Sequence, residues 1–195
     1  MEELIPADKR PFKALGKDRK EGPVIAVDMG YSKSNKSCGI APCKDKDDPN
    51  YKFGQAIDET VELLKDSESA DTVLVLEAPL STYHDNDSGN PDRRGEFENG
   101  RGWYYGAGSI TALAARRFLL KVAERLPENR EVALAEAFLS NKEEKTEHYE
   151  DSEKICSEFW DIKPETLPAD AEPLLPIIDG IPAVKVFEPE GSPDE

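Results

Sequence analysis

The sequence has few of the residues that build disulfide frameworks or covalent active sites. It contains three cysteines and two histidines among 195 residues. Cys38, Cys43 and Cys156 form no CxxC pair, and an odd number at irregular spacing is typical of reduced thiols in a cytosolic protein. No Ser-His-Asp or Cys-His arrangement occurs in a suitable context, so covalent hydrolysis by these groups is not expected.

Long apolar runs are also absent. The N-terminal residues contain no apolar segment typical of a signal peptide. No run approaches the ~20 apolar residues that a membrane-spanning helix needs. We therefore expect a cytoplasmic protein with no membrane partner.

Basic residues are scarce relative to acidic ones. Lys and Arg total 25 against 41 Asp and Glu, which gives a formal charge of -16. Because nucleic-acid affinity depends largely on Lys and Arg, this balance argues against a general nucleic-acid coat. It still allows an enzyme that binds nucleic acid through a local basic loop and a bound metal ion.

The composition divides the chain into three parts. Residues 1–22 are polar, locally basic and contain two prolines, which predicts a flexible basic arm. Residues 23–160 carry the regular patterns and form the predicted domain. Residues 161–195 are proline-rich and predict an extension with a short hairpin about Asp179-Gly180 and disordered last residues.

Within the central part, runs of β-branched and apolar residues predict strands, and apolar residues at i, i+4 and i+7 predict helices. The expected strands are 24–28, 37–41, 51–53, 72–77 and 132–139, and the expected helices centre on 57–64, 110–126 and 147–160. Parallel strands joined by helices make right-handed crossovers. The predicted fold class is α/β, with a mixed five-stranded sheet, an antiparallel hairpin at its front, later strands parallel, and helices on both faces.

Acidic residues fall at the ends of these strands. Asp28 ends the first strand, Glu77 ends the strand 72–77, and Glu136 lies near the end of 132–139. Asp151 shares the inward stripe of the last helix. Ligands bind at the carboxyl ends of parallel strands in open α/β sheets, so these four acids are the candidate catalytic residues.

Such a cluster suits a divalent metal ion. Neighbouring carboxylates repel one another, and Mg²⁺ or Mn²⁺ with oxygen ligands removes the conflict. The predicted metal ligands are Asp28, Glu77 and Asp151, with Glu136 supporting them. Local roles stay open, because Asp28 can cap a turn, Glu77 can accept backbone N–H groups and Asp151 can cap a helix.

The segments VIAVDMGYSKSNKSCGIA, TVLVLEAPLS, VALAEAFL and EHYEDSEKICSEFW together resemble the ribonuclease H-like superfamily, notably the RuvC-type resolvases and a group of predicted ribonuclease H-like nucleases. The resemblance covers roughly residues 23–160. It implies a strand–strand–strand–helix–strand–helix–strand–helix order with metal-binding acids on the first strand, fourth strand and last helix. Asp28, Glu77 and Asp151 match those positions. The implied activity is metal-dependent hydrolysis of nucleic-acid phosphodiesters.

The long polar segment 81–108 supplies candidate substrate contacts. Arg93, Arg94 and Arg101 occur there beside Trp and Tyr residues, a mixture that suits phosphates and unpaired bases, although the aromatics can equally pack on the core. His84 and His148 are candidate general bases or metal ligands, and each can equally be a solvated surface residue.

Two other functions stay open. Asp28-x-Gly30-x-Ser32 matches the phosphate-binding turn of actin-like ATPases and sugar kinases, in which a hydroxyl such as that of Ser32 contacts phosphate. Those proteins have two such domains, and this chain is too short for two. The other alternative is a non-catalytic adaptor on the same fold that presents its acidic surface to a basic protein partner.

Overall fold

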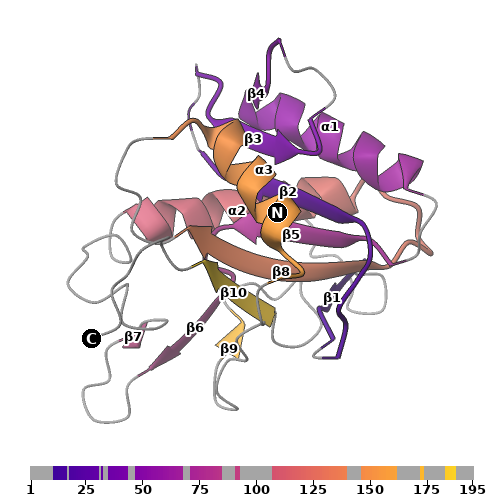
Figure 1. The fold of residues 1–195 in the computed structure, drawn as a ribbon, viewed down its shortest axis with the longest axis vertical. Coiled ribbons are helices and arrows are strands. Elements are labelled where there is room, and N and C mark those ends of the chain that lie inside the picture. The colour runs from indigo at the N-terminus through magenta and orange to yellow at the C-terminus, as the bar shows by residue number, and fades with distance from the viewer. Residues whose placement is uncertain are drawn as a thin grey trace.

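The chain forms a mixed sheet with helices on both of its faces (Figure 1). The computed structural model describes residues 11–16, 18–30, 32, 35–43, 47–67, 71–84, 91–92, 107–139, 146–161, 172–173 and 183–187. For 81–84, 91–92, 107, 138, 172–173 and 183–187 it describes the backbone alone.

The main sheet has seven strands in the order β1-β8-β5-β2-β3-β4, with β10 also paired to β8. Their bounds are β1 Phe12–Ala14, β2 Val24–Asp28, β3 Cys38–Ala41, β4 Asn50–Tyr51, β5 Val73–Glu77, β8 Val132–Leu139 and β10 Ala183–Phe187. The pairs β2–β3 and β3–β4 are antiparallel, whereas β2–β5 and β5–β8 are parallel. The predicted α/β class and antiparallel front hairpin are therefore confirmed.

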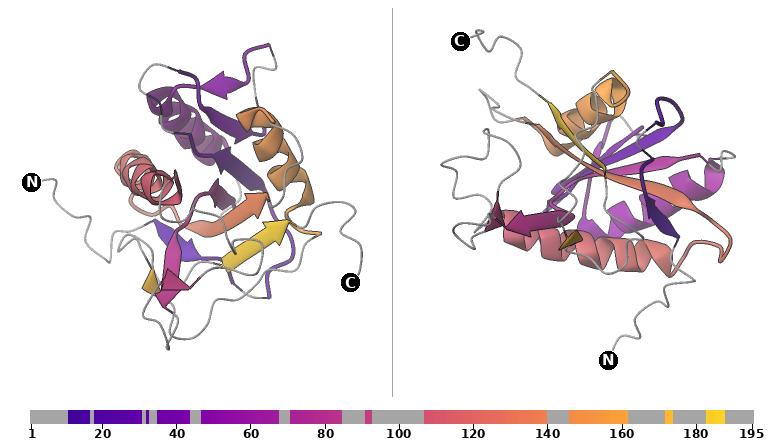
Figure 2. Two further views of the ribbon diagram at one scale, coloured as in Figure 1. Left: turned by 90° about the vertical axis from the view of Figure 1, so that its left-hand side faces the viewer. Right: turned by 90° about the horizontal axis from the view of Figure 1, so that it is seen from below.

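Three helices pack on this sheet within the described residues: α1 (Phe53–Asp66), α2 (Ala107–Ala123) and α3 (His148–Glu158). Helices α1 and α2 cover one face and α3 covers the other (Figure 2). Strand β2 is buried along its whole length, as expected for a central strand covered on both sides. Its continuous apolar run is the sequence signature of that position.

Side chains of successive strand residues point to opposite faces of the sheet, and this divides the core into two clusters. Ile25 and Val27 of β2 pack towards α1 and α2, whereas Val24 and Ala26 pack towards α3. Side chains two residues apart share a face, so Asp28 lies on the α3 face. The same alternation places Glu77, like Val75, on the α3 face.

The five-stranded sheet predicted from the sequence was incomplete, because both terminal segments add strands beside β8. Strand β1 pairs in parallel with residues 132–134, and β10 pairs in parallel with residues 135–139. The two short strands thus lie end to end along the outer side of one eight-residue strand. This pairing satisfies backbone groups that an edge strand would otherwise expose.

The prediction of a flexible arm over 1–22 was wrong for its second half. Phe12 is fully buried, and the backbone N–H of Leu15 donates to the carbonyl of Leu134. The sheet also extends beyond the predicted domain 23–160 into the C-terminal part. The predicted turn at Asp179-Gly180 lies outside the described residues, and Ala183–Phe187 pairs with β8.

A second, three-stranded sheet takes two strands from the segment 81–108, which was predicted to be a loop, and one from the predicted C-terminal extension. It has the order β7-β6-β9, formed by Ser81–His84 (β6), Pro91–Asp92 (β7) and Glu172–Pro173 (β9). These short strands are polar and carry no apolar alternation, so no sequence pattern indicated them. The rest of the predicted loop, residues 85–90 and 93–106, lies outside the described residues.

Smaller differences concern element ends. The predicted strand 51–53 corresponds to β4, which is Asn50–Tyr51. Phe53, which was predicted to end that strand, begins α1 instead. The three cysteines are free, which agrees with the reduced thiols expected. No helix in the described part of the chain combines the length and apolar character needed to cross a bilayer.

Candidate metal centre

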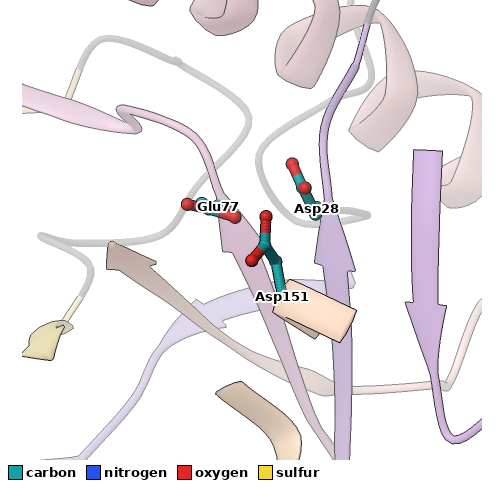
Figure 3. A group of neighbouring side chains, drawn as sticks. All are labelled: Asp28, Glu77 and Asp151. Carbon is teal, nitrogen blue, oxygen red and sulfur yellow. The ribbon is translucent and has the colours of Figure 1, made fainter. Parts of the chain in front are cut away.

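Three of the four predicted acids meet at one point. Asp28, Glu77 and Asp151 each offer a carboxylate oxygen, and these oxygens all lie within 4.8 Å of one another. Figure 3 shows the three side chains gathered where β2 and β5 end and α3 begins. Asp28 and Glu77 are direct partners in the parallel β2–β5 register, so the two carboxylates leave the same face side by side.

Each carboxylate has a partner in the protein. Oδ2 of Asp28 lies 2.7 Å from Nδ1 of His148, and Oδ1 of Asp151 accepts a 2.6 Å hydrogen bond from the hydroxyl of Thr146. Oε1 of Glu77 lies 3.5 Å from the backbone N–H of Leu139, at the end of β8. Asp28 and Asp151 are buried and Glu77 is half-buried.

A glycine in β3 allows α3 to approach closely enough to complete the cluster. Gly39 is the register partner of Asp28 across the β2–β3 pair. A Cβ atom at Gly39 would lie 2.0 Å from the carbonyl oxygen of His148, at the first turn of α3. The helix start therefore rests directly on the strand backbone, which places Asp151 opposite Asp28.

The start of α3 is fixed locally as well. The backbone N–H of Glu147, the N-cap residue, donates to Oε2 of Glu150 at 3.0 Å, one half of a capping box. From this start, Asp151, Ile155 and Phe159 follow one stripe, and all three are buried. The predicted placement of Asp151 on the inward face of the last helix is confirmed.

Glu136, which the sequence predicted to support the metal-binding acids, does not join the cluster. Glu136 is fully buried, but it lies two residues after Leu134, whose side chain packs towards α1 and α2. It therefore occupies the face opposite the cluster. Its Oε2 accepts a hydrogen bond from the backbone N–H of Leu80.

The other predicted site residues have different outcomes. His148 lies beside Asp28 and is partly exposed, with a side chain 40% accessible. His84 lies in β6, and its side chain is outside the described part, as are Arg93, Arg94 and Arg101 altogether. The hydroxyl of Ser32 accepts a 3.1 Å hydrogen bond from the backbone N–H of Asn35.

A buried thiol adjoins the cluster. Burial raises the pKa of Cys38 to about 11, and the charge of Asp28 contributes to the rise. The thiol also donates to the carbonyl of Gly30 at 3.1 Å. Cys38 is therefore a protonated packing residue at neutral pH and not a thiolate ligand.

Sequence reasoning missed Thr146 and Gly39. A glycine inside a strand marks a close backbone approach, so the pattern CGIA carried a usable signal for Gly39. Thr146 lies just before the helix, where polar residues are common, and nothing in its context distinguished it.

The donor set favours a hard divalent cation. Three carboxylate oxygens at this separation repel one another, and Mg²⁺ or Mn²⁺ prefers such oxygen ligands. Exposed acidic groups are common without any ion, but two members of this cluster are buried. Comparisons of the chain with protein-family models, curated proteins and solved structures give no match.

Proposed function

We propose that this protein is a metal-dependent nuclease that hydrolyses nucleic-acid phosphodiesters. The observation that carries the proposal is the convergence of Asp28, Glu77 and Asp151, with carboxylate oxygens within 4.8 Å of one another. These residues would hold Mg²⁺ or Mn²⁺. Bound there, the ion would supply activation of a water nucleophile and stabilisation of the leaving oxygen.

The order of elements supports a ribonuclease H-like fold. The strands β4-β3-β2-β5-β8 form an antiparallel front followed by parallel strands, and the three acids lie on the first and fourth of these strands in chain order and on the last helix. That is the arrangement which the sequence resemblance implies. The site also lies at the carboxyl ends of neighbouring parallel strands, where α/β proteins bind ligands.

His148 is the residue best placed to assist the reaction. Its Nδ1 contacts Asp28, and its ring is partly exposed beside the cluster. Histidine is a common partner of carboxylates and of reacting groups in enzyme sites. We assign to it the orientation of Asp28.

The acidic charge of the chain requires that nucleic acid be held locally. With a formal charge of -16, long-range attraction to phosphates is unfavourable. Arg93, Arg94 and Arg101 remain the proposed substrate contacts. A cation at the three carboxylates would further reduce the repulsion where the scissile phosphate must approach.

A thermal melt with Mn²⁺ and with Mg²⁺ tests the metal site. At a metal concentration 100 times Kd, stabilisation is ~2.7 kcal/mol. For a domain of this size, that corresponds to a rise in Tm of roughly 5–10 °C. Asp28→Asn is expected to abolish the rise, whereas Glu153→Gln, an exposed carboxylate on the same helix as Asp151, is expected to retain it.

Cleavage of labelled DNA and RNA in Mn²⁺ then tests the activity. Asp28→Asn and Glu77→Gln should each lose cleavage, and equal cleavage by these variants and the parent would refute the mechanism. A parent protein that shows no metal response with or without nucleic acid would favour the adaptor with a basic protein partner.

A further inference from the structure

A buried carboxylate on the opposite face of the sheet is linked to the end of β5. Glu136 is fully buried and lies on the sheet face that α1 and α2 cover. It is the register partner of Leu76 across the β5–β8 pair. Its Oε2 accepts the backbone N–H of Leu80. The three clustered oxygens of the candidate metal centre come from other residues.

The segment held by Glu136 is where the chain leaves the main sheet. Glu77 is the last residue of β5, and β6 begins at Ser81 in the second sheet. Between them, Ala78 and Leu80 are fully buried, and Pro79 has no backbone N–H to donate. The N–H of Leu80 is buried with them and needs an acceptor. The carboxylate oxygen of Glu136 is that acceptor.

From this geometry we propose that Glu136 is a positioning residue for Glu77. It fixes Leu80, so that the turn 78–80 cannot slide or fray, and this holds the final residue of β5 in register with Asp28. The inference rests on the proposed metal-dependent function. It gives Glu136 a role exerted through the backbone, from the face of the sheet that the metal centre does not occupy.

Two conservative variants separate the effect of the length of the Glu136 side chain from the effect of its charge. Glu136→Gln keeps the length of the side chain and an oxygen acceptor but removes the charge. Glu136→Asp keeps the charge but is shorter by one methylene, so its carboxylate no longer reaches the N–H of Leu80. If Glu136 acts by holding the turn, the Gln variant resembles the parent and the Asp variant is impaired. A purely electrostatic influence on the ion gives the reverse order.

The measurement is the Kd of Mn²⁺, obtained from the electron paramagnetic resonance signal of free Mn²⁺ well below the Tm of each variant. Removal of partners that orient metal ligands weakens metal binding ~10–100-fold, and we expect about 10-fold or more for Glu136→Asp. Glu136→Gln should stay within about threefold of the parent by the same reasoning. Amide hydrogen exchange should show faster exchange at Leu80 in the Asp variant only, with Leu74 in mid-strand as the internal reference.

A matched control removes the effect of general destabilisation. Leu134→Ala leaves a cavity on the same strand and face, two residues before Glu136, and leaves the Glu136 side chain itself unchanged. It should lower Tm while leaving the Kd of Mn²⁺ unchanged. If Leu134→Ala lost as much Mn²⁺ affinity as Glu136→Asp, the loss would reflect general destabilisation of the core, and the inference would be overturned.

The outcomes distinguish this inference from the proposed function. A parent that binds Mn²⁺, together with an Asp variant that binds it equally well, overturns the role of Glu136 alone. A parent that fails to bind Mn²⁺, with or without nucleic acid, overturns the metal centre and with it any positioning role. Weak binding by the Asp variant, parent-like binding by the Gln variant and faster exchange at Leu80 support it.

Discussion

The Nδ1 atom of His148, the first residue of α3, lies 2.7 Å from Oδ2 of Asp28, the last residue of β2. This contact joins two elements that are 120 residues apart in the chain. Asp151 follows on the next turn of the same helix, so the contact also sets the distance between two of the three clustered carboxylates. The geometry of the metal centre therefore depends on how the start of α3 is held.

We expect His148→Ala to weaken Mn²⁺ binding about 10-fold, since loss of a partner that orients a metal ligand typically costs this much or more. His148→Asn, whose side chain can place a polar atom near the position of Nδ1, should recover part of the loss. Tyr149→Ala is the control, because the hydroxyl of Tyr149 contacts Glu150 and not the cluster. Titration of each variant with Mn²⁺ checks the expectation, and a parent-like Kd for His148→Ala would contradict it.

Gly39→Ala should displace the start of α3. The added Cβ would lie 2.0 Å from the carbonyl oxygen of His148, a distance that neither backbone can accept without moving. We expect a loss of roughly 1–3 kcal/mol in the free energy of unfolding, the usual cost of overpacking, together with weaker Mn²⁺ binding.

Gly54→Ala provides the comparison for Gly39→Ala. A Cβ at Gly54, in the first turn of α1, meets nothing within 4 Å. Alanine is the better helix former, so this variant should gain up to ~1 kcal/mol. Urea unfolding of both proteins measures the difference, and similar stability for the two variants would show that α3 tolerates the extra atom.

The sequence predicted the central strands and the three clustered acids well because their signals are local. An apolar run such as Val24–Asp28 has few alternatives, and an acid at its end is visible directly. The sheet face on which Glu136 lies could also have been predicted, because side chains alternate between the two faces along Val132–Leu139. The prediction instead grouped Glu136 with the other acids because all of them lie near strand ends. The alternation of side chains along the strand places Glu136 on the face opposite the three clustered acids.

Other features depend on contacts that no local pattern encodes. Strand β1 is only three residues long, and its pairing with β8 is 120 residues distant in sequence at Phe12 and Val132. Whether such a segment is an arm or a strand depends on whether β8 offers a free side, which follows from the tertiary arrangement. The partnership of Thr146 with Asp151 likewise requires the exact path of the chain into α3.

Phe12→Ala tests whether the N-terminal segment belongs to the folded core. Phe12 is fully buried, and truncation of a buried Phe costs ~3–5 kcal/mol. Lys13→Ala, at the next position, removes an exposed side chain that pairs with Glu131, and such a surface pair contributes at most ~1 kcal/mol. Urea unfolding should therefore separate the two variants clearly, and equal stability would restore the flexible arm predicted from the sequence.

Cys38 should make stability depend on alkaline pH. Burial raises the pKa of its thiol from 9.0 to about 11, so the unfolded chain loses the proton at lower pH than the folded protein does. The folded state binds more protons in this window, and stability therefore falls as pH rises from about 9 to about 11, by ~1.4 kcal/mol per pH unit at most. Cys38→Ala lacks this titration but keeps the tyrosines and lysines that also ionise there. We expect the stability difference between parent and Cys38→Ala to shrink by ~2 kcal/mol between pH 8 and pH 10.5 in urea unfolding, whereas a constant difference would mean that the thiol ionises equally readily in both states.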